Sequence, residues 1–167
     1  MKLVEMHKAA VALAAALLAL AAPAAAAGPP WGPETPPFNI EVILRDVSGG
    51  SGFGHVKFRQ PNDGTKIVYL DTWVRDLAAN REYELQRAVD TTLDGECTST
   101  GWLTLGNLLE PRRITTDEGG TGRALLSRSF AALPLGMQFD IHFRVVEAGT
   151  GGATVLASGC YRFTVDQ

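Results

Sequence analysis

Residues 137–145, MQFDIHFRV, decide the fold class of this chain. Apolar side chains occupy every odd-numbered position of this stretch, and polar side chains occupy every even-numbered one. Successive side chains of a β-strand point to opposite sides of the sheet. This alternation therefore predicts a strand with one buried face and one polar face.

The same period of two recurs along the chain. Alternating or apolar segments of strand length are residues 38–44, 55–59, 66–74, 82–89 and 155–165. Clusters of Gly, Pro, Asn, Asp and Ser lie between them and are typical of turns. No segment after residue 27 has the periodicity of an amphipathic helix. We therefore predict an all-β domain, an antiparallel Greek-key sandwich or barrel of about eight strands.

Residues 1–27 have the pattern of a secretory signal peptide. A short basic start precedes an apolar run from Ala9 to Ala22, and residues 24–27 offer an Ala-x-Ala cleavage site. The prediction divides the rest into a Pro-rich leader, residues 28–37, and a single β-sandwich domain, residues 38–167. We expect a secreted or periplasmic protein with no membrane span after signal cleavage.

Charge and cysteine content narrow the function further. The chain has 15 Lys and Arg against 18 Asp and Glu, a net charge of −3, which argues against binding to nucleic acid. Its two cysteines are Cys97 and Cys160. An even number in an exported protein predicts a disulfide between them, with two free thiols or a metal-binding pair as the alternatives.

Residues 54–106 resemble the first half of a copper/zinc superoxide dismutase. Val56–Gln60 is similar to the opening strand of that family, and Glu96–Ser99 is similar to the context of its loop Cys. Thr116–Gly120 resembles a later turn of the family, and Cys160 is placed like its second Cys, in the last strand. The resemblance implies a dismutase-like Greek-key fold. An immunoglobulin-like sandwich is the alternative.

The metal chemistry of that family does not carry over. The two His of its copper-binding strand align with Glu84 and Gln86, and the His of its next loop falls near Leu103. Copper and zinc sites need several converging imidazoles, whereas this chain has only His55 and His142 after the signal peptide. We predict no catalytic, cofactor-binding or metal-binding residues and no cofactor.

Two weaker metal hypotheses concern other groups. His55 and His142 form a small site only if their strands lie side by side. The loop Asp90–Glu96 contains three carboxylates, which suit calcium, but its spacing does not match an EF-hand. Solvated surface groups are the simpler interpretation of both.

The candidate binding surface consists of Trp73, Glu84, Gln86 and Trp102. The resemblance places Glu84 and Gln86 on the floor of the lost copper site, although they also fit the solvent face of a strand. The two Trp residues fit the core or its rim, and one of them fits an exposed binding patch.

The sequence leads to a functional hypothesis with two alternatives. We expect an exported, non-catalytic β-sandwich domain that binds an envelope or extracellular protein or a glycan. The first alternative is a divergent superoxide dismutase-like metalloprotein with an unrecognised ligand set. The second is a purely structural, immunoglobulin-like envelope domain.

Overall fold

The computed structural model describes residues 40–61, 63–149 and 151–165. The predicted signal peptide and Pro-rich leader lie outside these residues. The described part of the chain is all β, as predicted, and contains no helix that could span a membrane.

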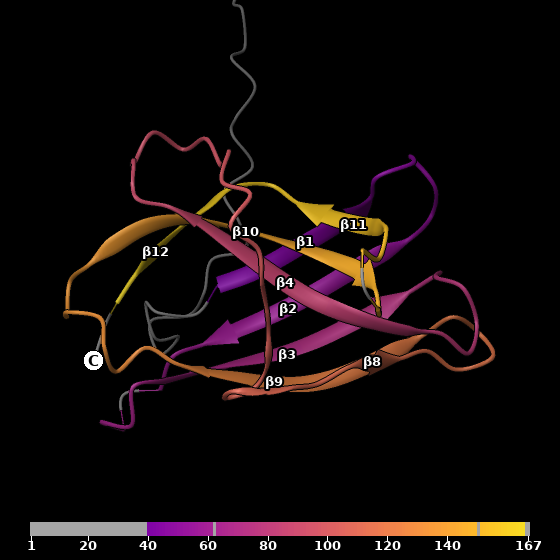
Figure 1. The fold of residues 1–167 in the computed structure, drawn as a ribbon, viewed down its shortest axis with the longest axis horizontal. Helices are drawn as coiled ribbons and strands as arrows, with labels where there is room; N and C mark the ends of the chain where they lie inside the picture. Colours follow the sequence, from indigo (N-terminus) through magenta and orange to yellow (C-terminus); the bar gives the residue numbers. More distant parts are fainter. Residues whose placement is uncertain (1–39, 62, 150, 166–167) are drawn as a thin grey trace, which may run out of the picture. The chain divides into compact units, whose positions relative to one another are not determined.

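The described residues form twelve strands (Figure 1). They are β1 (Ile40–Asp46), β2 (Phe53–Arg59), β3 (Ile67–Arg75), β4 (Glu82–Asp90), β5 (Leu103–Thr104), β6 (Gly106–Asn107), β7 (Glu110–Pro111), β8 (Ile114–Thr115), β9 (Gly122–Ser129), β10 (Gln138–Glu147), β11 (Thr154–Ser158) and β12 (Tyr161–Thr164).

The prediction of about eight strands is therefore wrong. Eight strands have four residues or more, and the other four, β5 to β8, have two residues each. A strand of two residues is too short to show an alternating pattern, so the sequence could not reveal those between residues 103 and 115.

The strands form one sheet that closes almost completely into a barrel. On one side β1, β2, β3 and β9 are antiparallel neighbours, and on the other β11, β10 and β4 continue from β1. The short β8 pairs with β4, and a bridge between Thr116 and Gly122 links its end to the start of β9. Among the strands of the described residues, the contact between β6 and β9 is the one parallel pairing.

The core lies inside this barrel, and β10 confirms the alternation from which the fold was predicted. Phe139, Ile141, Phe143 and Val145 are buried in a single hydrophobic cluster. Asp140 differs from its predicted role on a polar face, because only 1 % of its surface is exposed. The segment between β4 and β5 contacts the outer side of β10 here, through a hydrogen bond from Gly95 N to the Asp140 carboxylate.

Cys97 and Cys160 form the predicted disulfide, with their Cα atoms 5.4 Å apart. Cys160 lies in the short break between β11 and β12, both of which pair with β10. The bond therefore fastens the segment between β4 and β5 to the last part of the sheet. An intramolecular disulfide is compatible with an extracytoplasmic location.

Candidate ligand-binding site

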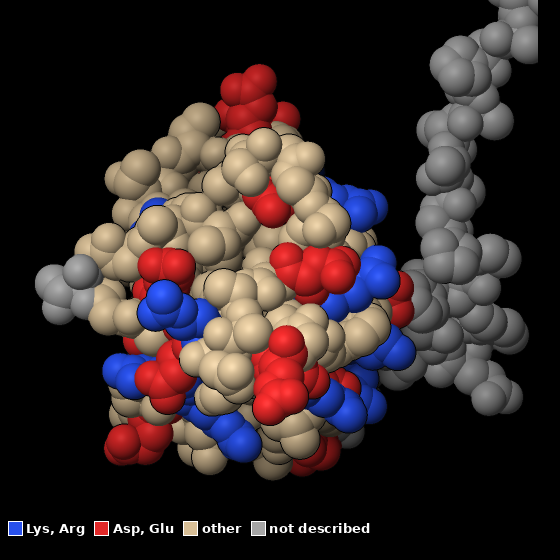
Figure 2. Space-filling model, turned by 90° about the vertical axis from the view of Figure 1, so that its right-hand side faces the viewer, with Lys and Arg blue, Asp and Glu red and all other residues tan. Residues whose placement is uncertain are grey.

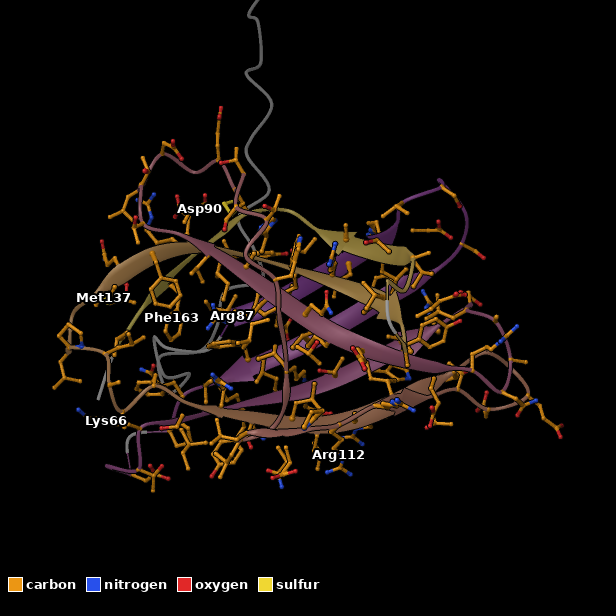
Figure 3. All side chains as sticks on the ribbon, in the orientation of Figure 1. Lys66, Arg87, Asp90, Arg112, Met137 and Phe163 are labelled. Carbon is orange, nitrogen blue, oxygen red and sulfur yellow. A yellow bond between two sulfur atoms is a disulfide. The ribbon has the colours of Figure 1, made fainter. Side chains whose placement is uncertain are left out.

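An apolar cavity of about 160 Å³ lies at one end of the barrel, where β4 and β9 end and β10 begins. We call this the open end. Figure 3 labels three residues of its lining, Arg87, Met137 and Phe163, which lie toward the left of the view. An apolar cavity of about 150 Å³ is large enough to bind one benzene molecule.

Aromatic rings form much of the cavity wall. Phe163 packs edge-on against Phe58, with ring centroids 5.0 Å apart, and its ring lies 5.1 Å from that of Phe139. The ring of Phe58 also packs against that of Phe143, with ring centroids 6.2 Å apart. Because these rings come from β2, β10 and β12 and hold one another in place, the wall is formed before any ligand arrives.

Arg87 is a charged residue on the otherwise apolar inward face of β4. Tyr83 and Leu85 are buried in the core, and Val89 packs against it. Arg87 has the same parity along the strand, so it also faces the interior, and its side chain lines the cavity. Sequence reasoning missed this residue. The available signal was a charged residue at a position where the alternation calls for an apolar one.

Arg128 repeats this departure on β9. Ala124, Leu126 and Phe130 share its parity and are buried, whereas Arg128 is half-buried and lines the cavity. Its Nη1 donates a hydrogen bond of 3.4 Å to the carbonyl oxygen of Leu108. The two arginines come from strands far apart in the sequence, so neither could be linked to the other before the fold was known.

The cavity mouth is positively charged. Burial lowers the pKa of the Arg87 guanidinium, and the nearby charge of Arg128 lowers this pKa further. Among the described residues, no Asp or Glu lines the cavity and neither arginine forms an ion pair. The remaining polar residues of the lining are Thr91 and Ser129.

Other arginines of the domain form ion pairs with carboxylates. Arg123 donates to both carboxylate oxygens of Asp71, at 2.8 and 2.6 Å. Arg162 pairs in the same way with Asp140, at 2.9 and 3.2 Å. Arg87 thus lacks the carboxylate partner that these surface arginines have.

Three of the four residues predicted to form a binding surface lie together on the outer side of the barrel. Arg144 Nε donates to Gln86 Oε1 at 2.8 Å, and its guanidinium lies 4.1 Å from the centroid of the Trp102 ring. Gln86 Nε2 donates to Thr104 Oγ1 at 3.0 Å, and this hydroxyl lies 3.4 Å from Glu84 Oε2. The polar atoms of this cluster therefore largely satisfy one another.

This cluster does not fit the copper ion that the dismutase resemblance implies. Glu84 and Gln86 contribute oxygen and amide donors, and Leu103 has no donor atom. The guanidinium of Arg144 adds a positive charge beside Gln86. Within residues 40–61, 63–149 and 151–165, no group of three or more His, Cys, Asp or Glu could hold a metal ion.

Trp73, the fourth predicted surface residue, lies elsewhere. It is on the outer face of β3 with 41 % of its surface exposed. Beside it is a shallow hollow of about 260 Å³ lined by His55, Lys57, Asp71 and Arg123. The structure therefore divides the predicted surface into two separate parts.

The two histidines have different neighbours. His142 stacks against Trp102, with ring centroids 4.5 Å apart, and its Nε2 lies 3.1 Å from the carbonyl oxygen of Ser99. His55 is on β2, with Nε2 3.7 Å from a carboxylate oxygen of Glu41. Nothing in the described residues brings the two imidazoles together.

The acidic groups of the loop Asp90–Glu96 contribute to its own folding. Asp90 accepts hydrogen bonds from Thr98 Oγ1 and Ser99 N, and Asp94 accepts one from Glu96 N. These contacts define turns and give no reason to place a calcium ion there.

Comparison with known proteins assigns no family: no protein-family model matches the chain, and no curated protein sequence matches it.

Proposed function

We propose that this protein is an exported, non-catalytic binding domain whose barrel takes up a small apolar molecule at its open end. The sequence alone predicted an envelope or extracellular protein or a glycan as the partner. The cavity favours a small molecule, because it is enclosed on several sides by side chains of six strands and their adjoining loops.

The observation that supports this proposal is the apolar cavity. Burying apolar surface contributes roughly 25 cal/mol per Å² removed from water. A cavity whose wall is already ordered retains most of this free energy for binding, because few side chains must be immobilised. The rings of Phe58, Phe139 and Phe163 provide such a wall.

The proposal is tested by titrating the mature protein with 1-octanol in a calorimeter. We expect saturable binding with one molecule per chain. Val89→Phe, at the half-buried rim of the cavity, should abolish this binding, because the added ring occupies the space. Leu125→Phe is the matched control, since Leu125 lies on the outer face of β9 with 58 % of its surface exposed. If the Val89→Phe variant binds 1-octanol with the same affinity as the wild type, the proposal is contradicted.

The fold of this domain is proposed to be a dismutase-like Greek-key barrel that has no copper site. Two observations support it. The consecutive strands β3 and β4 do not pair with each other. Instead, β4 pairs with β10. The loop Cys97 is bonded to Cys160 near the last strand, as the resemblance implies. Elemental analysis of the purified protein should find no stoichiometric copper, and one tightly bound equivalent would favour the alternative, a divergent metalloprotein.

A further inference from the structure

We propose that the ligand of the cavity is an amphipathic anion, a small carboxylate with an apolar tail, and that Arg87 and Arg128 together bind its head group. This inference rests on the proposed function, because it assigns the chemical class of the molecule that the apolar cavity takes up. It adds a prediction that the cavity alone does not make: a preference of the protein for negative charge.

The positions of the two arginines support the inference. Each occupies an inward-facing position of its strand, and each lines the cavity at the open end. Placing a guanidinium among apolar side chains is unfavourable unless an opposite charge compensates it. Among the described residues, none that lines the cavity carries a compensating carboxylate. A bound anion would provide it.

The proximity of Arg87 and Arg128 strengthens this argument. Both arginines line this one cavity, and the charge of Arg128 adds to the larger effect of burial in lowering the pKa of Arg87. Two like charges at one apolar mouth raise the free energy of the empty protein, and a single anion between them removes that cost. Each guanidinium offers several N–H donors in a planar fork that matches the two oxygens of a carboxylate. Thr91 and Ser129 add hydroxyl groups to the same lining.

The cavity determines the size of the tail. Its volume of about 160 Å³ accommodates an apolar group of roughly six to eight carbon atoms. An inorganic anion would leave the aromatic wall without a partner, and an apolar cation would meet two positive charges. A medium-chain carboxylate uses both the wall and the arginines, and this combination leads us to that class.

The inference is tested with three probes of equal chain length: octanoate, 1-octanol and octylamine. They carry a negative charge, no charge and a positive charge at pH 7.5. We expect octanoate to bind roughly 10- to 100-fold more tightly than 1-octanol. This factor corresponds to the free energy that a hydrogen bond to a charged group contributes. Octylamine should bind more weakly than either of the other two.

Single variants identify the groups responsible. Arg87→Gln and Arg128→Gln should each reduce the preference for octanoate over 1-octanol by about 10-fold. Arg112→Gln is the matched control, because Arg112 is exposed, does not line the cavity and lies in another part of the domain (Figure 3). This control should retain the full preference for octanoate.

The outcomes separate the inference from the proposed function. If 1-octanol and octanoate bind with equal affinity, the inference is overturned, but the proposed apolar site is still supported. A preference for octanoate that survives both Arg87→Gln and Arg128→Gln would also overturn it. Failure of both probes to bind would overturn the proposed function itself. We expect the preference for octanoate to fall with either cavity variant and to remain unchanged with Arg112→Gln.

Discussion

The two ends of the barrel differ in whether their inward-facing polar groups have partners. At the closed end, formed by residues 76–81 and 116–121, the Thr116 hydroxyl lies in a hydrogen-bonding network although only 2 % of the residue is exposed. It donates to Ala78 O at 2.7 Å and accepts from Arg81 N at 3.0 Å. At the open end, Arg87 has no carboxylate partner within the described residues.

The closed end also packs tightly against its own backbone. Leu77 N donates to Gly120 O at 3.2 Å, and Gly120 has a φ of +73°. A Cβ atom at Gly120 would lie 2.1 Å from Leu77 O, so no larger residue fits there without displacing the chain. Figure 2 shows this end of the domain from outside, with acidic and basic side chains interspersed over its surface.

This difference indicates which end stabilises the domain and which end binds. A fully paired buried group contributes to folding, whereas an unpaired buried charge opposes it. Charged groups in such unfavourable surroundings are concentrated at functional sites. We therefore expect substitutions at the two ends to have opposite effects on the free energy of unfolding.

The largest effect should come from the disulfide that fastens the segment between β4 and β5 to the break between β11 and β12. The double substitution Cys97→Ser, Cys160→Ser should lower the free energy of unfolding by about 4 kcal/mol, because the bond links residues 63 positions apart and restricts the unfolded chain. Urea unfolding of the wild-type and double-variant proteins measures the difference. Reduction of the wild type should reproduce it, and an unchanged midpoint in both experiments would contradict the prediction.

Removal of the buried hydroxyl at the closed end should have the next largest effect. Thr116→Val keeps the shape of the side chain but leaves Ala78 O and Arg81 N without their partner. We expect a loss of about 2 kcal/mol in the free energy of unfolding, measured by urea denaturation. Thr115→Val is the control, since Thr115 is the exposed neighbour, and it should change the stability little. Equal effects of the two substitutions would show that the network contributes nothing.

Removal of the charge at the open end should have a smaller effect of opposite sign. Arg87→Leu should raise the free energy of unfolding of the ligand-free protein by about 1 kcal/mol, because an apolar residue replaces an uncompensated guanidinium on the inward face. The same urea experiment measures it. A loss of stability would instead mean that Arg87 helps to hold the barrel together, and the comparison between the two ends would fail.

The last prediction concerns acid. Hydrogen bonds from Arg162, and then from Gly95 N, lower the pKa of Asp140 below its ordinary value of about 4. The stabilisation from this carboxylate is therefore complete above that ordinary value and is lost as the pH falls through the lowered one. Asp140→Asn should be less stable than the wild type at pH 6, and the gap should narrow toward pH 2. A gap independent of pH would rule out the ion pair as its source.

Much of the sheet could be predicted from the sequence, because strands with one buried face show their period directly. The stretch from Met137 to Val145 became β10 almost unchanged. The short strands between residues 103 and 115 could not be predicted, since two residues have no period. The closure of the sheet depends on pairings between distant segments, such as Glu82 with Thr115, which no local pattern contains.

The candidate site was harder to predict than the fold. Glu84, Gln86 and Trp102 were selected as a surface, and the structure places them in one cluster. Arg87 could be overlooked because Tyr83, Leu85 and Val89 alone are enough to predict a strand with one apolar face. Only the fold shows that Arg87 and Arg128, on β4 and β9, line the same cavity. A charged residue at an inward position is thus worth testing in any chain of this kind.

The most direct test of the account is a crystal structure of the mature protein with 8-bromooctanoate. Bromine scatters anomalously, so its position can be located independently of the rest of the ligand. We expect the bromine inside the cavity between Phe139 and Phe163, and the carboxylate in contact with both Arg87 and Arg128. Bromine bound instead at the hollow beside Trp73, or a carboxylate turned away from both arginines, would contradict the claim that the open end binds amphipathic anions.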